Sequence, residues 1–159
     1  MARLEFRGPF LLAFALDQQL STLLQLAMAE APLTPGEFAV YSALRLMQPT
    51  TPTQLAGALG MKATTLSSVL VRMSRKGHLK RRRNPADGRS VILTLTASGV
   101  RVTEACFASF GQAIQAFRRQ LTVDEAALLQ HLEAMSVAIE QATEELAGRD
   151  QQDYAEAGG

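Results

Sequence analysis

The stretch Leu79–Leu95 reads L-K-R-R-R-N-P-A-D-G-R-S-V-I-L-T-L and decides the fold of this chain. Two short strand-like runs flank a turn, and the second run, Val91–Leu95, holds the β-branched and apolar residues that favour strands. Asp87-Gly88 is typical of a tight hairpin turn. The stretch therefore predicts a basic β-hairpin with Arg89 at its tip, where an arginine can reach into a DNA minor groove.

The positive charge of the chain is concentrated around this hairpin. Nine basic residues and one acidic residue lie from Lys62 to Arg89, a net charge of +8, and because the whole chain carries +1, the remainder carries −7. This asymmetry favours a cationic face for a polyanion on an otherwise acidic body. A solvated charged face without a partner is the alternative, but the cluster coincides with a structural motif, which favours the polyanion.

The chain before the hairpin is predicted to form four helices. Apolar residues at three- and four-residue spacing predict a helix over residues 8–30, which ends before Pro32. The run T-P-G-E at 34–37 is a capping box with proline at the first helical position, and it begins a helix that ends before Pro49.

A second capping box, T-P-T-Q at 51–54, begins a short helix that ends at Gly60. The next helix is expected over Ala63–Lys76, ending at Gly77. These two helices and the tight turn between them have the pattern of a helix-turn-helix.

Two long helices are expected after the hairpin. Thr96 can cap a helix that runs to about Gln120. A third capping box, T-V-D-E at 122–125, begins a last helix through about Leu146, and residues 148–159 are expected to be a flexible, frayed tail.

The predicted fold class is mainly α with a small β-hairpin wing. Residues 34–96 would form a winged helix-turn-helix within a single domain over residues 1–147. The helices in 1–31 and 97–147 are too apolar for a monomer of this size, so we expect them to form a dimerisation region.

The expected helix Ala63–Lys76 has two distinct faces. Leu66, Val69, Leu70 and Met73 form an apolar face, whereas the other side carries short hydroxyl side chains and arginines suited to base edges and phosphates. An ordinary amphipathic surface helix is the alternative. The candidate DNA-binding residues on this helix and the hairpin are Lys62, Thr64, Thr65, Ser67, Ser68, Arg72, Arg75, Lys80, Arg82, Arg83, Asp87 and Arg89.

The hairpin offers more basic side chains than can act together. Residues 80–83 are suited to phosphates, but side chains alternate along a strand, so about half can face DNA at once. Asp87 is expected to pair with Arg89 or a nearby arginine and to fix its direction. A generic Asp-Gly turn, in which the carboxylate has only a local role, is the alternative.

Several motifs together resemble the MarR (multiple antibiotic resistance regulator) family. They are N-x-x-D-x-R at 84–89, V-x-L-T at 91–94 and T-x-x-G at 96–99, with L-A at 55–56 and R-x-x-x-x-G at 72–77 in support. The resemblance implies a homodimer that binds pseudo-palindromic double-stranded DNA, usually as a repressor. It also implies that Ala63–Lys76 is the recognition helix and Arg89 the minor-groove arginine.

The resemblance further implies release of DNA by a small, often aromatic or phenolic, ligand between the dimerisation and DNA-binding regions. Candidate lining residues are Phe14, Tyr41, Leu44, Arg45 and Met47, for which a place in the core is the alternative. One branch of the family senses hydroperoxides through a first-helix cysteine and another senses urate through a first-helix tryptophan. This sequence has neither, and its one cysteine, Cys106, is expected to be a buried small hydrophobe.

No enzyme, cofactor or metal site is expected. The sequence has no phosphate-binding glycine motif or nucleophile elbow, and His78 and His131 are not at metal-ligand spacing. One cysteine excludes an intramolecular disulfide and fits a reducing, cytoplasmic compartment. We expect no membrane span, because no run approaches the roughly 20 apolar residues that a span needs.

Two other functions are compatible with the pattern. A winged-helix protein-interaction module would present its basic face to an acidic partner instead of reading DNA. Alternatively, the chain would be the dimerisation domain of a small-molecule enzyme such as a methyltransferase, but it holds no motif of a cofactor-binding domain.

Overall fold

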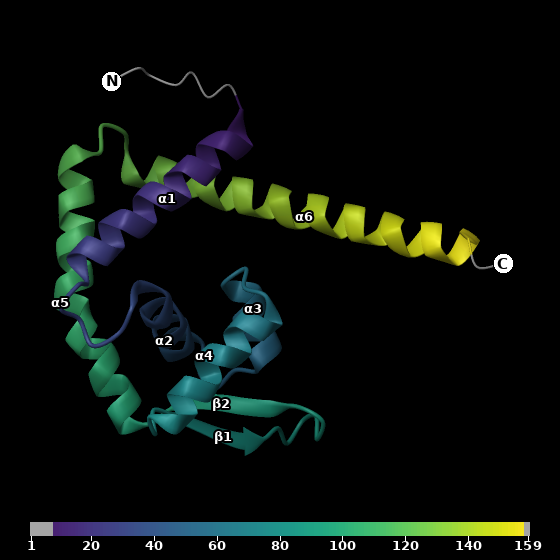
Figure 1. Ribbon diagram of the computed structural model, residues 1–159, viewed down its shortest axis with the longest axis horizontal. Coiled ribbons are helices and arrows are strands. Elements are labelled where there is room, and N and C mark those ends of the chain that lie inside the picture. Colours follow the sequence, from purple (N-terminus) through teal and green to yellow (C-terminus); the bar gives the residue numbers. More distant parts are fainter. Residues whose placement is uncertain (1–7, 158–159) are drawn as a thin grey trace. The chain divides into compact units, whose positions relative to one another are not determined.

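The computed structural model describes residues 8–157, with side chains described through residue 148 (Figure 1). Its elements are α1 (Pro9–Ala27), α2 (Pro35–Met47), α3 (Pro52–Ala58), α4 (Ala63–Arg75), β1 (Leu79–Arg83), β2 (Val91–Leu95), α5 (Ala97–Gln120) and α6 (Glu125–Ala157). The chain divides into two compact units, Met1–Ala116 and Phe117–Gly159, and the boundary lies inside α5. Each unit is described separately.

The predicted fold class is confirmed. The first unit contains α2, α3 and α4, followed by the two-stranded antiparallel sheet β1–β2, the element order of a winged helix-turn-helix (Figure 1). Residue Thr50 extends the sheet by exchanging backbone hydrogen bonds with Leu93, which ties the end of α2 to the hairpin.

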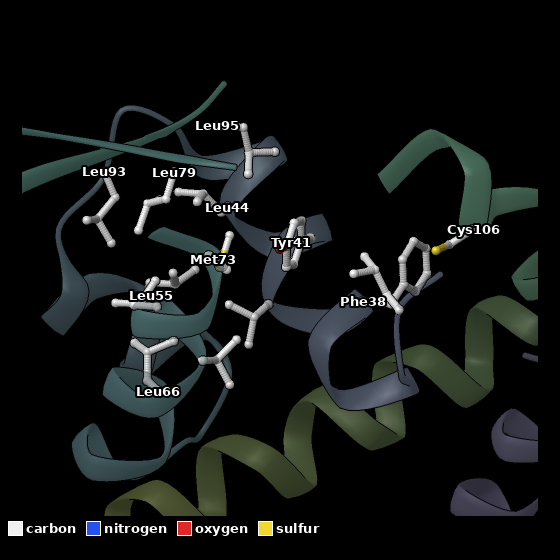
Figure 2. Packing of buried hydrophobic residues seen from close by; sticks show 14 of the residues in the cluster. Phe38, Tyr41, Leu44, Leu55, Leu66, Met73, Leu79, Leu93, Leu95 and Cys106 are labelled. Carbon is white, nitrogen blue, oxygen red and sulfur yellow. The ribbon is translucent and has the colours of Figure 1, made fainter. Parts of the chain in front are cut away.

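The core of the first unit lies between α2, α3, α4 and the hairpin (Figure 2). Tyr41 and Leu44 of α2 are almost completely buried, as is Leu93 of β2. Buried Leu79 and Leu95 occupy paired positions at the base of the hairpin. Because these apolar side chains hold the hairpin against α2 and α4, the position of the wing relative to α4 is set by core packing.

Side-chain caps set several helix ends as predicted. The hydroxyls of Thr34 and Thr51 accept hydrogen bonds from the third helical residue, and both reciprocal capping boxes are present. Thr96 Oγ1 accepts from the backbone N–H of Gly99 at 3.1 Å. The expected cap at Thr122 is wrong: α6 begins at Glu125, and Asp124 Oδ2 accepts from the N–H of Ala127 at 2.9 Å.

Both terminal helices differ from the expected lengths. Helix α1 ends at Ala27 instead of residue 30, because Met28 turns into the core, where it is 3% exposed. Helix α6 continues to Ala157, so the expectation that it ends near Leu146 is wrong. Once a helix is formed, each added residue gains a hydrogen bond, and Gly148 alone does not stop it. Residues 1–7 and 158–159 lie outside the described part.

Helix α1 has no buried residue within this chain, and it exposes large apolar side chains such as Phe10, Phe14 and Leu20. Among the described residues it is the helix long and apolar enough to cross a membrane, which corrects the expectation that no run approaches that length. An interface helix of an oligomer meets the same criteria. In the second unit, α6 likewise exposes Leu129, Leu132 and Ile139.

Candidate nucleic-acid interface

A tight turn places α4 after α3. Gly60 has a positive φ of 59°, a conformation that glycine adopts without strain, and the N–H of Met61 donates to the carbonyl of Ala56 at 3.0 Å. Helix α4 then buries Leu66, Val69, Leu70 and Met73 on one side, as predicted. Its opposite side, with Thr64, Ser68 and Arg75, is exposed.

One flank of α4 is bound to α2 by charge. Nε of Arg72 lies 3.2 Å and Nζ of Lys76 lies 3.8 Å from Oε1 of Glu37. The Glu37 side chain is 13% exposed, whereas that of Arg72 is 49% exposed. In the protein without DNA, one N–H donor of Arg72 is therefore already hydrogen-bonded to a carboxylate.

Glu37 is held in its ionised form by these partners. Burial by itself raises the pKa of this carboxyl, but the hydrogen bonds from Arg72 and the backbone N–H of Thr34, with the positive charges of Lys76 and Arg72, lower the pKa below its ordinary value. The same residue thus completes the cap of α2 and anchors the last turn of α4.

The hairpin distributes its basic side chains over both faces. In the register of the sheet, Arg81 lies opposite buried Leu93, so Arg81 and Arg83 share the face of Leu79, while Lys80 and Arg82 lie on the other face. Arg81 lines a hollow of about 300 Å³ together with side chains such as Ala56 of α3 and Leu66 of α4. The candidate set of Lys80, Arg82 and Arg83 therefore does not lie on one face of the hairpin.

Side-chain hydrogen bonds shape the loop at the wing tip. Nδ2 of Asn84 donates to Oγ of Ser90 at 2.8 Å, and Oδ1 of Asn84 accepts from the N–H of Ala86 at 3.0 Å. Oδ1 of Asp87 accepts from the backbone N–H of Arg89 at 3.0 Å. No ion pair of Asp87 occurs in the described part of the chain, so the expectation that it pairs with a guanidinium is wrong: its carboxylate serves the turn instead.

Arg83 and Arg89 take different positions at the tip. Nε of Arg83 donates to the carbonyl of Gly88 at 3.4 Å, and a Cβ at Gly88 would lie 2.7 Å from Nη2 of Arg83. Arg83 therefore covers the loop at Gly88. Arg89 lines an open recess of about 520 Å³ between the wing and residues 51–54 at the start of α3.

The base of the wing is tied to α2 and α5. The hydroxyl of Tyr41 lies 2.9 Å from Nδ1 of His78, and Oγ1 of Thr96 donates to the carbonyl of Gly77 at 2.8 Å. Burial, helped by the positive charge of Lys76, lowers the pKa of His78, and burial with the negative charge of Glu37 raises the pKa of Tyr41 to about 12. Both side chains are thus neutral at pH 7.

All candidate DNA-binding residues predicted from the sequence are exposed, from Lys62 to Arg89. The structure adds Arg81 and Val71 to this candidate set. The sequence already suits Arg81 to phosphates with the rest of residues 80–83, and the register places it on the hairpin face of buried Leu79. Val71 is 40% exposed on α4, and the sequence signal for it is that it falls outside the helical spacing of the buried apolar residues.

The candidate ligand-lining residues separate into two groups. Tyr41 and Leu44 are at most 1% exposed and belong to the core, which was the alternative interpretation. Phe14 is 66% exposed on α1. Arg45 forms an ion pair of 2.9 Å with Glu104. Of the five side chains, Phe14, Arg45 and Met47 are therefore at least partly exposed within this chain.

Cys106 is buried, as expected. Its side chain is fully covered, and its Sγ donates to the carbonyl of Val102 at 3.4 Å. Burial raises the pKa of the thiol, although a backbone hydrogen bond from Leu33 opposes the shift. A buried thiol with a raised pKa is a poor nucleophile at neutral pH.

The fold, the exposed polar side of α4 and the cationic hairpin together define a winged helix-turn-helix protein with a positively charged face. Comparison with known proteins agrees with this class. The sequence model of the MarR family matches residues 33–91. The multiple antibiotic resistance protein MarR of Escherichia coli is 32% identical over 117 residues, which cover 73% of this chain and 81% of that protein.

Solved structures show the same likeness. A mutant of E. coli MarR complexed with operator DNA is 30% identical, with a TM-score of 0.68 over 79% of this chain and 90% of that one. The PcaV transcriptional regulator of Streptomyces coelicolor, in complex with its natural ligand, is 28% identical, with a TM-score of 0.72 over 87% of this chain and 98% of that one. The chain belongs to the MarR family of transcriptional regulators, which are not enzymes.

Proposed function

We propose that this protein is a homodimeric, cytoplasmic repressor that binds pseudo-palindromic double-stranded DNA. Helix α4 would enter the major groove, and the wing would place Arg89 in the adjacent minor groove. One observation carries this proposal: all nine basic side chains between Lys62 and Arg89 are exposed. Asp87, the one acidic residue in this stretch, accepts a hydrogen bond from the backbone of the turn and forms no ion pair with these side chains in the described structure.

We assign the exposed residues of α4 and the hairpin to different parts of the DNA. Thr64, Thr65, Ser67, Ser68 and Arg75 are available to base edges and phosphates along α4. Lys62 immediately precedes the first turn of α4. In the described structure this turn has no acidic residue and no side-chain cap, so the backbone N–H groups of the turn suit a phosphate. On the hairpin, Lys80, Arg81, Arg82 and Arg83 are the candidates for phosphates, and because side chains alternate along the strand, either Arg81 and Arg83 or Lys80 and Arg82 face the DNA at once.

The apolar terminal helices support the homodimer. Leu16 on α1 and Leu132 on α6 are each about half exposed within one chain, and each has large apolar neighbours on its own helix. Exposed apolar faces of this length mark interaction sites. A two-fold dimer would present two α4 helices, which matches a pseudo-palindromic operator.

Gel-shift and footprinting assays on the DNA upstream of the protein's own gene test the proposal. Arg89→Ala should lower affinity about tenfold or more without changing the circular dichroism spectrum, because a wing tip supports little core. Arg119→Ala, an exposed arginine outside the wing, is the matched control. Unchanged affinity of a folded Arg89→Ala variant would refute the wing assignment, and the absence of any footprint would favour a protein-interaction module.

Sedimentation tests the dimer. Leu16→Glu or Leu132→Glu should produce monomers, because a charge would be buried in the interface. Leu46→Glu changes an 87% exposed leucine at the end of α2 and should leave the dimer intact. If all three variants sediment as dimers, the terminal helices do not form the interface.

We also propose that a small aromatic or phenolic ligand releases the DNA. Support comes from the likeness to PcaV, whose structure holds its natural ligand. Of the side chains proposed for this chain, Phe14, Arg45 and Met47 are at least partly exposed and available to a ligand. Footprints repeated with phenolic compounds test the idea, and a footprint that no compound weakens would remove its support.

A further inference from the structure

Val71 occupies the middle of the exposed side of α4. It is 40% exposed, whereas Val69, two residues earlier, is 6% exposed in the core. Its neighbours one turn before are Ser67 and Ser68, and those one turn after are Ser74 and Arg75. All four are exposed, so Val71 is an isolated apolar group on a polar surface.

The fold of this chain gives no reason for a valine at this position. An exposed valine gains little from burial, and its branched side chain is a weaker helix former than alanine. A docking surface for an apolar protein partner would need a wider patch, whereas the neighbours along α4 are serines and an arginine. The side chain therefore fits a partner that offers one apolar group within polar surroundings.

We propose that Val71 determines specificity by packing its methyl groups against the C5-methyl of a thymine in the operator. The thymine methyl is the apolar group that base pairs display in the major groove, among hydrogen-bond donors and acceptors. The small side chains of Ser67, Ser68 and Ser74 let the helix approach the base edges closely, which a side chain as short as valine requires. This inference rests on the proposed function, in which α4 lies in the major groove.

Single-methyl changes in the DNA test the proposal. A duplex is first selected from random sequence by the purified protein, and each thymine is then replaced by deoxyuridine, which removes the methyl and keeps the base-pairing groups. At one position of each half-site the wild-type protein should lose about fourfold in affinity, the effect expected for one buried methyl-sized group. Val71→Ala should lose a similar factor on the selected duplex and show no further loss upon that replacement.

A matched variant completes the experiment. Val123→Ala removes the same atoms from a 58% exposed valine outside the winged region and should keep the wild-type response to deoxyuridine. The proposal is overturned if no replacement lowers wild-type affinity, or if Val71→Ala responds as the wild type does. In either case the selected duplex still binds, so the proposed function stands. If no duplex is selected at all, both the inference and the proposed function fail.

Discussion

Arg72 donates from Nε to Oε1 of Glu37 across 3.2 Å, and this contact joins the first turn of α2 to the last turn of α4. The two residues are 35 positions apart in the sequence. Because Lys76 approaches the same oxygen, one carboxylate holds two cations on the flank of the proposed recognition helix. The contact therefore fixes α4 and limits what Arg72 can offer to DNA.

A double-mutant cycle measures this contact. Glu37→Gln keeps a side chain that can still complete the capping box, so it removes chiefly the charge. We expect Glu37→Gln and Arg72→Gln to couple by about 0.5–1 kcal/mol in urea unfolding, since Arg72 is half exposed and partly screened by solvent. Arg75→Gln, which has no contact with Glu37 in the described structure, should show no coupling. Equal coupling of both arginines would disprove a specific pair.

The salt dependence of DNA affinity should distinguish the contribution of Arg72 from that of Arg75. Arg75→Ala should reduce the slope of log affinity against log salt by about one unit for each lost phosphate contact, whereas Arg72→Ala should reduce it less, because Glu37 already engages Arg72. The measurement is a fluorescence-anisotropy titration at several salt concentrations. A larger change for Arg72→Ala than for Arg75→Ala would contradict this assignment.

The pH dependence of stability should contain a contribution from His78. Its pKa is lowered from about 6.5 by burial and by Lys76, so at pH values between the folded and unfolded pKa the unfolded chain binds more protons. The stabilisation is complete above pH 6.5 and is lost as the pH falls through the lowered folded value. Unfolding at pH 5.5 and 7.5 should show a smaller difference for His78→Asn than for the wild type. Identical differences would exclude this role.

Two glycines of α5 should respond in opposite directions to alanine. A Cβ at Gly99 would lie 2.4 Å from the carbonyl oxygen of His78, where backbone cannot easily move, and we expect Gly99→Ala to destabilise the fold by about 1–3 kcal/mol. A Cβ at Gly111 would meet no atom within 4 Å in this chain, so Gly111→Ala should stabilise by up to about 1 kcal/mol through helix propensity. Thermal unfolding compares the two variants. If Gly99→Ala left the stability unchanged, the backbone at His78 would be able to move away from the added Cβ.

Local chemistry explains which elements were predictable. Threonine caps and prolines define the starts of α2 and α3, and Asp87-Gly88 marks the turn between β1 and β2, because a cap or a turn involves residues only two or three positions apart. The cap of α6 was misplaced because Thr122 and Asp124 both offer a suitable oxygen, and only the path of the chain selects Asp124.

The candidate site was predictable in composition but not in arrangement. The residue types of the cationic face, from Lys62 to Arg89, are evident in the sequence, and every one of them is exposed. Which arginines are already engaged was not evident, because Glu37 reaches Arg72 only after α2 packs on α4. The burial of Tyr41 and Leu44 likewise depends on that packing.

The sequence by itself determined the order of the helices, the hairpin, the caps and the accumulation of positive charge, because these depend on near neighbours and on residue type. Tertiary structure alone decided which side chains are already engaged. Packing of α2 against α4 places Glu37 on Arg72 and buries Tyr41 and Leu44 in the core. The physical reason is that the availability of a side chain depends on contacts between residues far apart in the chain, which no local pattern contains.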